Sequence, residues 1–220
     1  MIKIAPSILT ANLVDLKKEI NLLERAEVDL IHIDVMDGTF VPNISFGMPV
    51  VKAIKNQTSI PLDVHLMIIN PERYTQEFIE AGANYITIHQ EATIHLHRNL
   101  THIKKLGAKA AVSINPSTPL QSIEEVIEIC DMILIMSVNP GFGGQTFIES
   151  SLSKIQRLKE IILKNGYDTL IEVDGGINFD NTKKIVQSGA DILVIGNSIF
   201  SSPDIITTIN LFKAYANLKQ

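Results

Sequence analysis

Short apolar runs rich in Ile, Val and Leu recur along this chain about every 20 to 35 residues, and segments of helical period separate them. This alternation predicts an α/β protein with a parallel sheet. Eight strand–helix units in 220 residues predict a single (β/α)8 TIM barrel that spans residues 1–220. The expected strands are Ile2–Leu9, Leu30–Met36, Leu62–Met67, Tyr85–His89, Lys109–Ile114, Met132–Ser137, Leu170–Asp174 and Ile192–Ile195.

The segments between these strands have apolar residues at helical spacing. A doubly wound open sheet is the structural alternative. Its glycine-rich turn usually follows the first strand, whereas the glycine-rich turns of this chain follow the late strands. The expected helices are one with Leu13, Leu16, Ile20 and Leu23 on one face, then Pro49–Lys55, Pro71–Ala81, His95–Leu106, Leu120–Cys130, Leu152–Lys164, Asn181–Ser188 and a final helix within Asp204–Leu218.

Composition narrows the possible partners and compartment. The net charge of −5 and the lack of a long Lys/Arg run argue against nucleic acid or an anionic membrane as the main partner. Cys130 is the only cysteine, which excludes an intrachain disulfide and fits a small core residue in a reducing compartment. Since the N-terminus lacks a signal-peptide pattern and no apolar run approaches the roughly 18 residues of a membrane span, we expect a cytoplasmic protein.

Polar side chains lie on one face of several expected strands. Residues two apart share a face, so His32 pairs with Asp34 on the second strand, and Asp63 pairs with His65 on the third. Asp174 ends the seventh strand with the same parity. In a barrel these faces point inward, where an unpartnered imidazole or carboxylate costs roughly a few kcal/mol. Nitrogen and oxygen donors suit one divalent ion, either Zn, Fe, Mn or Co, held by His32, Asp34, His65 and Asp174.

The other histidines and inward carboxylates have plainer interpretations. Asp63 and Glu172 lie deeper along their strands, where we expect them to orient a histidine ring. His89 ends the fourth strand and either faces the pocket or caps the strand. The segment 39–47 after the Asp37-Gly38 turn either folds over the pocket or only connects. A solvated helix face is expected for His95, His97 and His102.

Glycine clusters follow the last three expected strands. Backbone N–H groups in such turns can curl round an anion, and barrels often bind phosphate with the loops after strands seven and eight. We therefore expect main-chain amides to bind a phosphate without an arginine, while Lys154 and Arg157 lie on a solvated helix face. The clusters are Gly141-Phe142-Gly143-Gly144, Gly175-Gly176 and Gly196-Asn197.

Together these motifs resemble the ribulose-phosphate 3-epimerase family over nearly the whole chain. The resemblance implies a metal-dependent ribulose-phosphate-binding barrel that interconverts D-ribulose 5-phosphate and D-xylulose 5-phosphate in the pentose phosphate pathway, and a homo-oligomer. The motifs are Ala5-Pro6-Ser7-Ile8-Leu9, His32-Ile33-Asp34-Val35-Met36-Asp37-Gly38, Asp63-Val64-His65-Leu66-Met67, Met136-Ser137-Val138-Asn139-Pro140-Gly141-Phe142-Gly143-Gly144-Gln145 and Glu172-Val173-Asp174-Gly175-Gly176-Ile177.

The resemblance also implies roles for individual positions. Asp34 and Asp174 would be the two acid–base residues as well as metal ligands, beside His32 and His65. Many members have Ser where Asn197 stands, and we expect little consequence because the backbone N–H is the expected contact. Met36, Met67 and Met136 would line the pocket. The substrate-binding residues would be Ser7, His65, Gly141, Phe142, Gly143, Gly144, Asp174, Gly175, Gly176, Gly196 and Asn197.

The implied chemistry removes a proton from the carbon beside a ketone and returns it on the opposite face. Asp34 and Asp174 would act from the two sides of an enediolate that the metal stabilises. One alternative is an epimerase for a six-carbon ketose phosphate such as allulose 6-phosphate. A metal-dependent aldolase or lyase is a second, although we find no inward lysine at a strand end. A non-catalytic phosphate-binding barrel is a third, although a structural metal site would close its coordination sphere.

Overall fold

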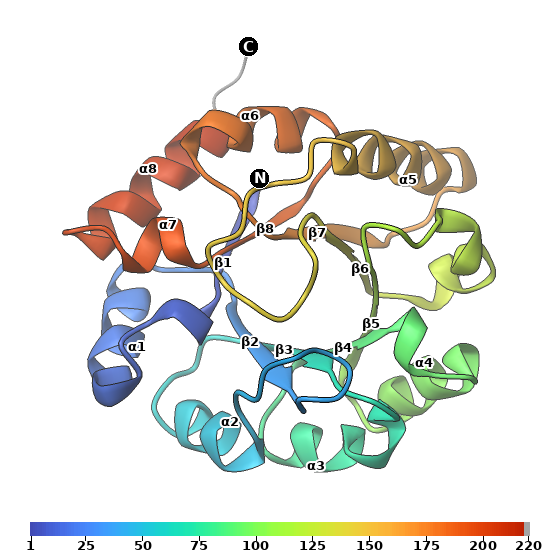
Figure 1. Cartoon of the computed structure of the whole chain (residues 1–220), viewed down its shortest axis with the longest axis horizontal. Coiled ribbons are helices and arrows are strands. Elements are labelled where there is room, and N and C mark those ends of the chain that lie inside the picture. Colours follow the sequence, from blue (N-terminus) through green and yellow to red (C-terminus); the bar gives the residue numbers. More distant parts are fainter. Residues whose placement is uncertain (218–220) are drawn as a thin grey trace.

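The computed structural model describes residues 1–217 and contains eight parallel strands surrounded by helices (Figure 1). Each strand pairs in parallel with its neighbour in the sheet order β1-β8-β7-β6-β5-β4-β3-β2, which confirms the predicted barrel. The strands are β1 (Lys3–Pro6), β2 (Ile31–Met36), β3 (Leu62–Met67), β4 (Tyr85–His89), β5 (Lys109–Ile114), β6 (Met132–Met136), β7 (Leu170–Asp174) and β8 (Ile192–Ile195).

The barrel closes least tightly between β1 and β2, where the single bridge from Ser7 to His32 replaces a ladder of hydrogen bonds. The predicted strand Ile2–Leu9 was too long at its C-terminal end. After β1, Ser7 instead caps a 3-10 turn, Ile8–Thr10, by accepting a hydrogen bond from the Leu9 N–H. This turn directs the chain outward at the strand end and leaves the Ser7 side chain facing the interior.

Helices cover the outside of the barrel in the predicted order. The short α7 was not predicted. The predicted last helix extended to Leu218 and the predicted domain to residue 220, but residues 218–220 lie outside the described residues. The helices are α1 (Leu16–Arg25), α2 (Met48–Lys55), α3 (Thr75–Glu80), α4 (Leu96–Lys105), α5 (Ser151–Asn165), α6 (Phe179–Gln187), α7 (Asn197–Phe200) and α8 (Ile205–Asn217).

The predicted helix Leu120–Cys130 is instead two 3-10 segments, Leu120–Ser122 and Glu124–Ile129. Its buried residues, Leu120, Ile123, Val126, Ile127 and Cys130, keep the apolar spacing on which the helix prediction was based, so the spacing alone does not distinguish the 3-10 segments from an α-helix. β-branched side chains, which have a low helix propensity, make up much of this segment.

Two predictions about exposure are confirmed. Cys130 is buried, and the three histidines in or next to the helix after β4 are exposed, namely His95, His97 and His102.

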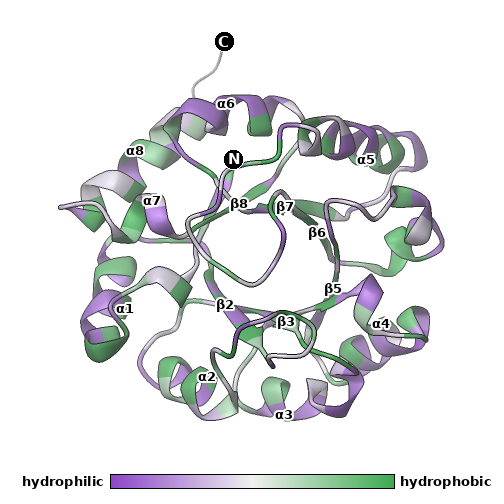
Figure 2. Ribbon diagram, viewed as in Figure 1, coloured by the Kyte–Doolittle hydropathy of each residue, from purple (hydrophilic) through white to green (hydrophobic). Residues whose placement is uncertain are grey.

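Two apolar layers follow from the alternation of strand side chains. Outward residues such as Ile33 and Val64 pack against the helices in the larger core, and Figure 2 shows apolar stretches along the helices that cover the strands. A smaller inner layer of Ala5, Ala111 and Met132 fills the barrel beneath the polar residues. The inward polar groups therefore lie between an apolar floor and the carboxyl ends of the strands.

Lys154 contradicts the prediction of a solvated side chain. It is buried on α5, and its Nζ donates to the carbonyl oxygens of Asn115, Pro116 and Thr118 at 2.8 to 2.9 Å. Arg157 on the same helix is exposed, as predicted. Lys154 thus anchors the loop after β5. Among the described residues, no helix combines the length and apolar character that crossing a membrane requires.

Candidate active site

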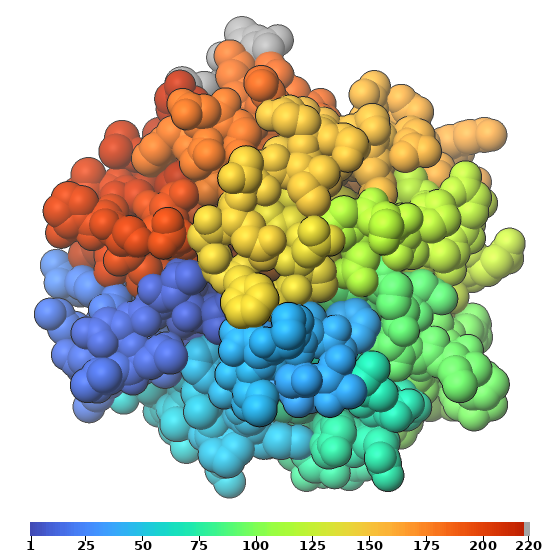
Figure 3. All heavy atoms as spheres, in the orientation of Figure 1, coloured from blue at the N-terminus to red at the C-terminus, as the bar shows by residue number. Residues whose placement is uncertain are grey.

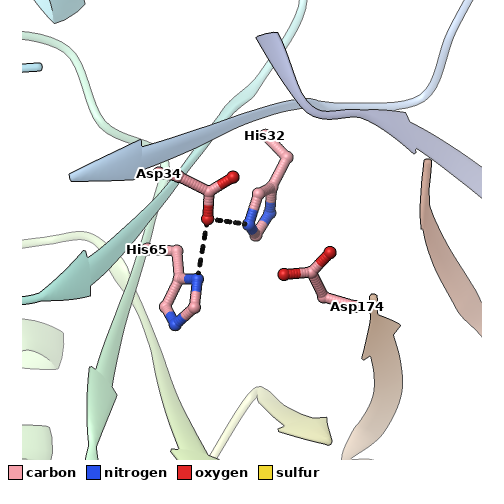
Figure 4. A group of neighbouring side chains, drawn as sticks. All are labelled: His32, Asp34, His65 and Asp174. Carbon is pink, nitrogen blue, oxygen red and sulfur yellow. Dashed lines mark hydrogen bonds and ion pairs between the residues drawn. The ribbon is translucent and has the colours of Figure 1, made fainter. Parts of the chain in front are cut away.

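Four side chains predicted to gather at the strand ends do gather there. Each of His32, Asp34, His65 and Asp174 offers one donor atom, and these atoms all lie within 4.8 Å of one another. Figure 4 shows Asp174 reaching from β7 toward the other three, which come from β2 and β3. The two carboxylates therefore approach the same space from different sides of the barrel mouth.

Asp34 lies at the centre of the hydrogen bonds in this cluster. Its Oδ1 is 3.0 Å from His65 Nδ1 and 3.3 Å from His32 Nε2, as the dashed lines in Figure 4 mark. Its Oδ2 accepts a 2.6 Å hydrogen bond from the Ser7 hydroxyl. The bridge between Ser7 and His32 holds β1 against β2 at this point, so the local closure of the barrel also orients Asp34.

The surroundings separate the pKa values of the two carboxyl groups. Burial acts to raise the pKa of Asp34, but the charge of His32 and hydrogen bonds from His32 and His65 hold it well below its usual range. Burial and then the negative charge of Asp34 raise the pKa of Asp174 to about 7. A pair of carboxyl groups whose environments push their pKa values apart is typical of acid–base sites.

The pKa values of His65 and His32 are likewise shifted in opposite directions. Burial lowers the pKa of His65 to about 4, which keeps this ring neutral at pH 7. For His32, the charges of Asp34 and Asp63 outweigh burial and raise the pKa. Asp63 Oδ2 lies 2.5 Å from His32 Nδ1, so Asp63 orients the ring as its position on β3 predicted.

Glu172, for which the same orienting role was predicted, makes no such contact. It is fully buried, and both its carboxyl oxygens lack a hydrogen-bond partner among the described residues. Burial and then the charge of Asp63 raise its pKa well above the usual value. Glu172 lies close to His32 and Asp63, on the floor side of the cluster.

A cavity of about 410 Å³ opens above the cluster. His32 and His65 are fully buried and form no part of its lining, so direct contact of His65 with a substrate stays a prediction. Three methionines expected in the pocket, Met36, Met67 and Met136, do line it. The other predicted residues along its wall are Ser7, Asp34, Gly141, Phe142, Gly143, Gly144, Asp174, Gly175, Gly176, Gly196 and Asn197.

The glycine-rich loops at this cavity leave no room for a larger residue at Gly143, Gly176 or Gly196. A Cβ on Gly176 would lie 2.4 Å from the Phe147 N atom, and its φ of +65° is unfavourable for other residues. A Cβ on Gly143 would lie 2.5 Å from Thr10 Cγ2, and one on Gly196 would lie 2.9 Å from Thr10 Oγ1. The loops after β6 and β7 thus meet backbone to backbone, and the loops after β6 and β8 both lie against the Thr10 side chain. Backbone amides in glycine turns of this kind can bind an anion.

The segment 39–47 does fold over the barrel mouth. The Asn43 side-chain amide donates to the Gly141 carbonyl oxygen at 3.0 Å, and Val41 packs against Gly141. Figure 3 shows this blue segment meeting the yellow loop after β6 on the face of the molecule. Asp37 forms the predicted turn, accepting hydrogen bonds from the N–H groups of Thr39 and Phe40.

The sequence analysis did not single out several residues of the cavity wall. Thr10 Oγ1 is buried without a hydrogen-bond partner among the described residues, beside the glycine loops. Lys184 of α6 is a basic side chain in the lining, 3.9 Å from the Glu149 carboxylate. Neither occurs in a motif with unusual residue types, and only the three-dimensional fold brings them to the cavity.

The donor set fits a divalent metal ion. Two imidazoles and two carboxylates supply the nitrogen and oxygen atoms that Zn, Fe, Mn and Co accept. His32 also has the carboxylate partner on its second ring nitrogen that metal-binding histidines commonly have. The cavity beside the cluster leaves space for a ligand next to an ion, as catalytic metal sites require.

Comparison with known families decides the assignment. A model of the ribulose-phosphate 3 epimerase family matches residues 3–200. The chain belongs to the ribulose-phosphate 3-epimerase family. It is 50% identical to the ribulose-phosphate 3-epimerase of Synechocystis over 92% of this chain and 89% of that protein. It is 49% identical to the Bacillus subtilis enzyme of the same name over 93% of this chain and 94% of that protein. Membership of this family identifies the chain as an epimerase.

Solved structures of other enzymes share the fold at low sequence identity. The 3-hexulose-6-phosphate synthase of Salmonella typhimurium has a TM-score of 0.74 and 18% identity, with 98% of each chain covered. The orotidine 5'-phosphate decarboxylase of Pyrococcus horikoshii has a TM-score of 0.71 and 16% identity, covering 98% of this chain and all of that one. At this level of identity the likeness supports the barrel fold alone.

Proposed function

We propose that this protein interconverts D-ribulose 5-phosphate and D-xylulose 5-phosphate by moving a proton between two aspartates. The observation that carries the proposal is the approach of Asp34 and Asp174 from different strands to one donor cluster beneath a glycine-lined cavity. Inversion at carbon 3 needs a proton carrier on each face of the sugar, and these two carboxylates reach the cluster from β2 and β7. The family's name supports the same substrate.

His32, Asp34, His65 and Asp174 would hold one divalent ion, which would stabilise the negative charge that develops on the substrate oxygens. In one direction, Asp34 removes the carbon-3 proton and Asp174 delivers one to the opposite face; in the reverse direction, they exchange roles. The split between their pKa values supports one group acting as base while the other acts as acid.

The other residues of the cavity would bind and orient the substrate. Backbone amides of the loops Gly141–Gly144, Gly175–Gly176 and Gly196–Asn197 would bind the phosphate. The Ser7 hydroxyl, which donates to Asp34, would hold that carboxylate in place and contact the sugar. The three methionines would pack over the planar intermediate.

Solvent deuterium exchange in Asp34→Asn and Asp174→Asn variants tests the two-aspartate mechanism. Each variant should lose about 10²–10⁴-fold in kcat/KM for epimerisation, or roughly 3–5 kcal/mol. Each should also exchange the carbon-3 proton of only one epimer, and the two variants should favour opposite epimers. Asp168→Asn is the control, because this exposed carboxylate precedes β7 at the far end of the barrel.

Metal content is measured on the same samples, so loss of the ion is separated from loss of the base. Full epimerisation by either variant with its metal retained would contradict the mechanism. Loss of parental activity with a chelator and its return with Zn²⁺, Mn²⁺, Fe²⁺ or Co²⁺ would support a metal requirement. Activity that persists in metal-free protein would argue against it.

Parallel assays address the remaining alternatives. Comparing kcat/KM for ribulose 5-phosphate and allulose 6-phosphate separates five-carbon from six-carbon specificity. An intact carbon skeleton after turnover excludes an aldolase. The described strands carry lysine only at the N-terminal ends of β1 and β5, as Lys3 and Lys109, away from the carboxyl ends where the cluster lies. A homo-oligomer stays a prediction, which light scattering of the purified protein tests.

A further inference from the structure

Thr10 lies where the loops after β6 and β8 come together at the cavity. It ends the 3-10 turn Ile8–Thr10 and forms part of the cavity wall. Its Oγ1 atom is buried and has no hydrogen-bond partner among the described residues. A side-chain hydrogen bond therefore does not hold Thr10 in place, and the contacts that the structure shows for this residue are packing contacts.

The Thr10 methyl group fills the space that a side chain on Gly143 would need. A Cβ on Gly143 would lie 2.5 Å from Thr10 Cγ2, and beyond the neighbouring residues of the chain no other described atom lies within 4 Å of it. Gly143 is also outside the set of glycines with a positive φ, so a left-handed backbone does not require glycine there. The obstacle to a larger residue at Gly143 is thus this one methyl group.

The same side chain packs against the loop after β8. A Cβ on Gly196 would lie 2.9 Å from Thr10 Oγ1 and 3.6 Å from Thr10 Cγ2. Ser7, which caps the turn at its other end, donates to the Asp34 carboxylate. One short turn therefore contacts both the acid–base end of the cavity and two of its glycine loops.

We propose that Thr10 is a positioning residue whose methyl group sets the spacing between the loops after β6 and β8, and thereby holds their backbone amides where they bind the substrate phosphate. This inference rests on the proposed function, because it takes the glycine loops as the phosphate site. Removing one buried methyl group typically changes an equilibrium constant roughly 3–10-fold. A loss of this size is expected in phosphate binding when the methyl group of Thr10 is deleted.

Two substitutions of Thr10 separate its methyl group from its hydroxyl group. Thr10→Ser removes Cγ2 and keeps the hydroxyl, whereas Thr10→Val keeps the methyl and replaces the unpartnered hydroxyl with a second methyl. Thr10→Ser should weaken phosphate binding roughly 3–10-fold, and Thr10→Val should bind phosphate more tightly than Thr10→Ser. The opposite order would show that the hydroxyl contacts the phosphate, and it would overturn the inference.

A double substitution is a sharper test, because the added methyl group of Gly143→Ala meets only one atom. Gly143→Ala alone should weaken phosphate binding roughly 5–100-fold through overpacking against Thr10 Cγ2. Adding Thr10→Ser removes that atom, so the double variant should bind phosphate more tightly than Gly143→Ala. If the effects of the two substitutions simply multiplied, the contact would carry no coupling and the inference would be wrong.

Inorganic phosphate is the probe, and its dissociation constant is measured on the full chain by ³¹P NMR titration, which needs no turnover. Steady-state kinetics with ribulose 5-phosphate give the second readout. Thr10→Ser should raise KM by the same factor as the phosphate dissociation constant and lower kcat less, because a phosphate contact far from the reacting carbon contributes mainly to uniform binding. A lower kcat with the parental KM would contradict the inference.

Thr75→Ser is the matched control, since Thr75 is buried on α3 and is no part of the cavity wall. It loses the same methyl group, so its Tm should fall while its phosphate affinity stays parental. An equal loss of phosphate affinity in this control would overturn the inference, because general loosening of the fold would then explain Thr10→Ser.

Failure of the proposed function gives a different result from failure of this inference. If the parental protein binds no phosphate, both are wrong. If it binds phosphate but does not epimerise ribulose 5-phosphate, the proposed reaction is wrong and the phosphate titrations still decide the role of Thr10. Parental phosphate affinity in Thr10→Ser would overturn the inference alone.

Discussion

The close approach of Gly176 to the neighbouring loop predicts a specific loss of substrate binding in Gly176→Ala. The added Cβ would lie 2.4 Å from Phe147 N and 2.8 Å from the Gln145 carbonyl oxygen. Backbone atoms cannot rotate out of the way as side chains can, so the loop after β6 has to shift. Gly176 and the residues of that loop line the same cavity, so the proposed phosphate site should change with it.

Two matched glycines separate this clash from the cost of the backbone conformation. Gly144 has φ +73° and Gly166 has φ +70°, close to the +65° of Gly176, but a Cβ on either meets nothing within 4 Å. Alanine in this left-handed region costs about 1 kcal/mol. Overpacking adds about 1–3 kcal/mol for Gly176→Ala alone. The expected losses of stability are therefore about 1 kcal/mol for the controls and about 2–4 kcal/mol for Gly176→Ala.

Thermal unfolding and steady-state kinetics measure the two effects. For a chain of this size, the Tm should fall by about 2–4 °C in Gly166→Ala and by about 4–16 °C in Gly176→Ala. Displacing one amide from a charged phosphate costs about 1.5–3 kcal/mol, so the KM for ribulose 5-phosphate should rise roughly 10–100-fold in Gly176→Ala. Gly166→Ala should keep the parental KM, because it ends α5 outside the cavity. If Gly176→Ala had the Tm and KM of Gly166→Ala, the steric argument would be wrong.

Three further predictions concern the surroundings of the site. Asp63→Asn should weaken Zn²⁺ binding roughly 10–100-fold, because His32 Nδ1 loses its carboxylate partner. Competition with a chelator measures the affinity, and parental affinity in this variant would contradict the prediction. Lys154→Met should lower the free energy of unfolding, measured by urea titration, by about 3 kcal/mol, because three carbonyl oxygens lose their donor. The control Arg157→Met, at an exposed position, should change it by less than about 0.5 kcal/mol. Burial opposes ionisation of Glu91, but hydrogen bonds from His89 and neighbouring donors lower its pKa to about 2 from 4.5. The ionised carboxylate therefore stabilises the fold above about pH 4.5, by about 1–2 kcal/mol after solvent screening, and this advantage over Glu91→Gln should vanish as the pH falls toward 2.

Side-chain parity explains why so much of the site could be predicted from the sequence. Alternation along β2 and β3 places His32, Asp34 and His65 on the inside wherever the strand ends lie, so errors of one or two residues at the boundaries do not move them. The barrel brings strand ends together at one rim. Asp174 joins the others by the same rule, although it is more than 100 residues away along the chain.

The errors arise where long-range packing overrides local pattern. Lys154 lies on the buried face of α5 with Ile155 and Leu158, and the carbonyl groups of the loop after β5 explain how a lysine is accommodated there. Thr10 lies just beyond β1, whose end at Pro6 could not be recognised within the apolar run Ile2–Leu9. Its contact with the glycine loops depends on the 3-10 turn that ends β1 early. Neither contact has a counterpart in residue spacing.

A chain of contacts that runs from Glu91 through His89 and His65 to Asp34 lies between these two cases. Side-chain parity places His65 and His89 on the inner face of adjacent strands. It does not say which ring nitrogens meet, and the position of the proton on each ring depends on that contact. Glu91 lies beyond the strand end, so strand periodicity does not extend to it. Its partners come from the loop after β5 that Lys154 anchors. A buried lysine outside the cavity thus supports the loop that fixes Glu91, and through Glu91 and His89 it helps to hold the His65 ring in place.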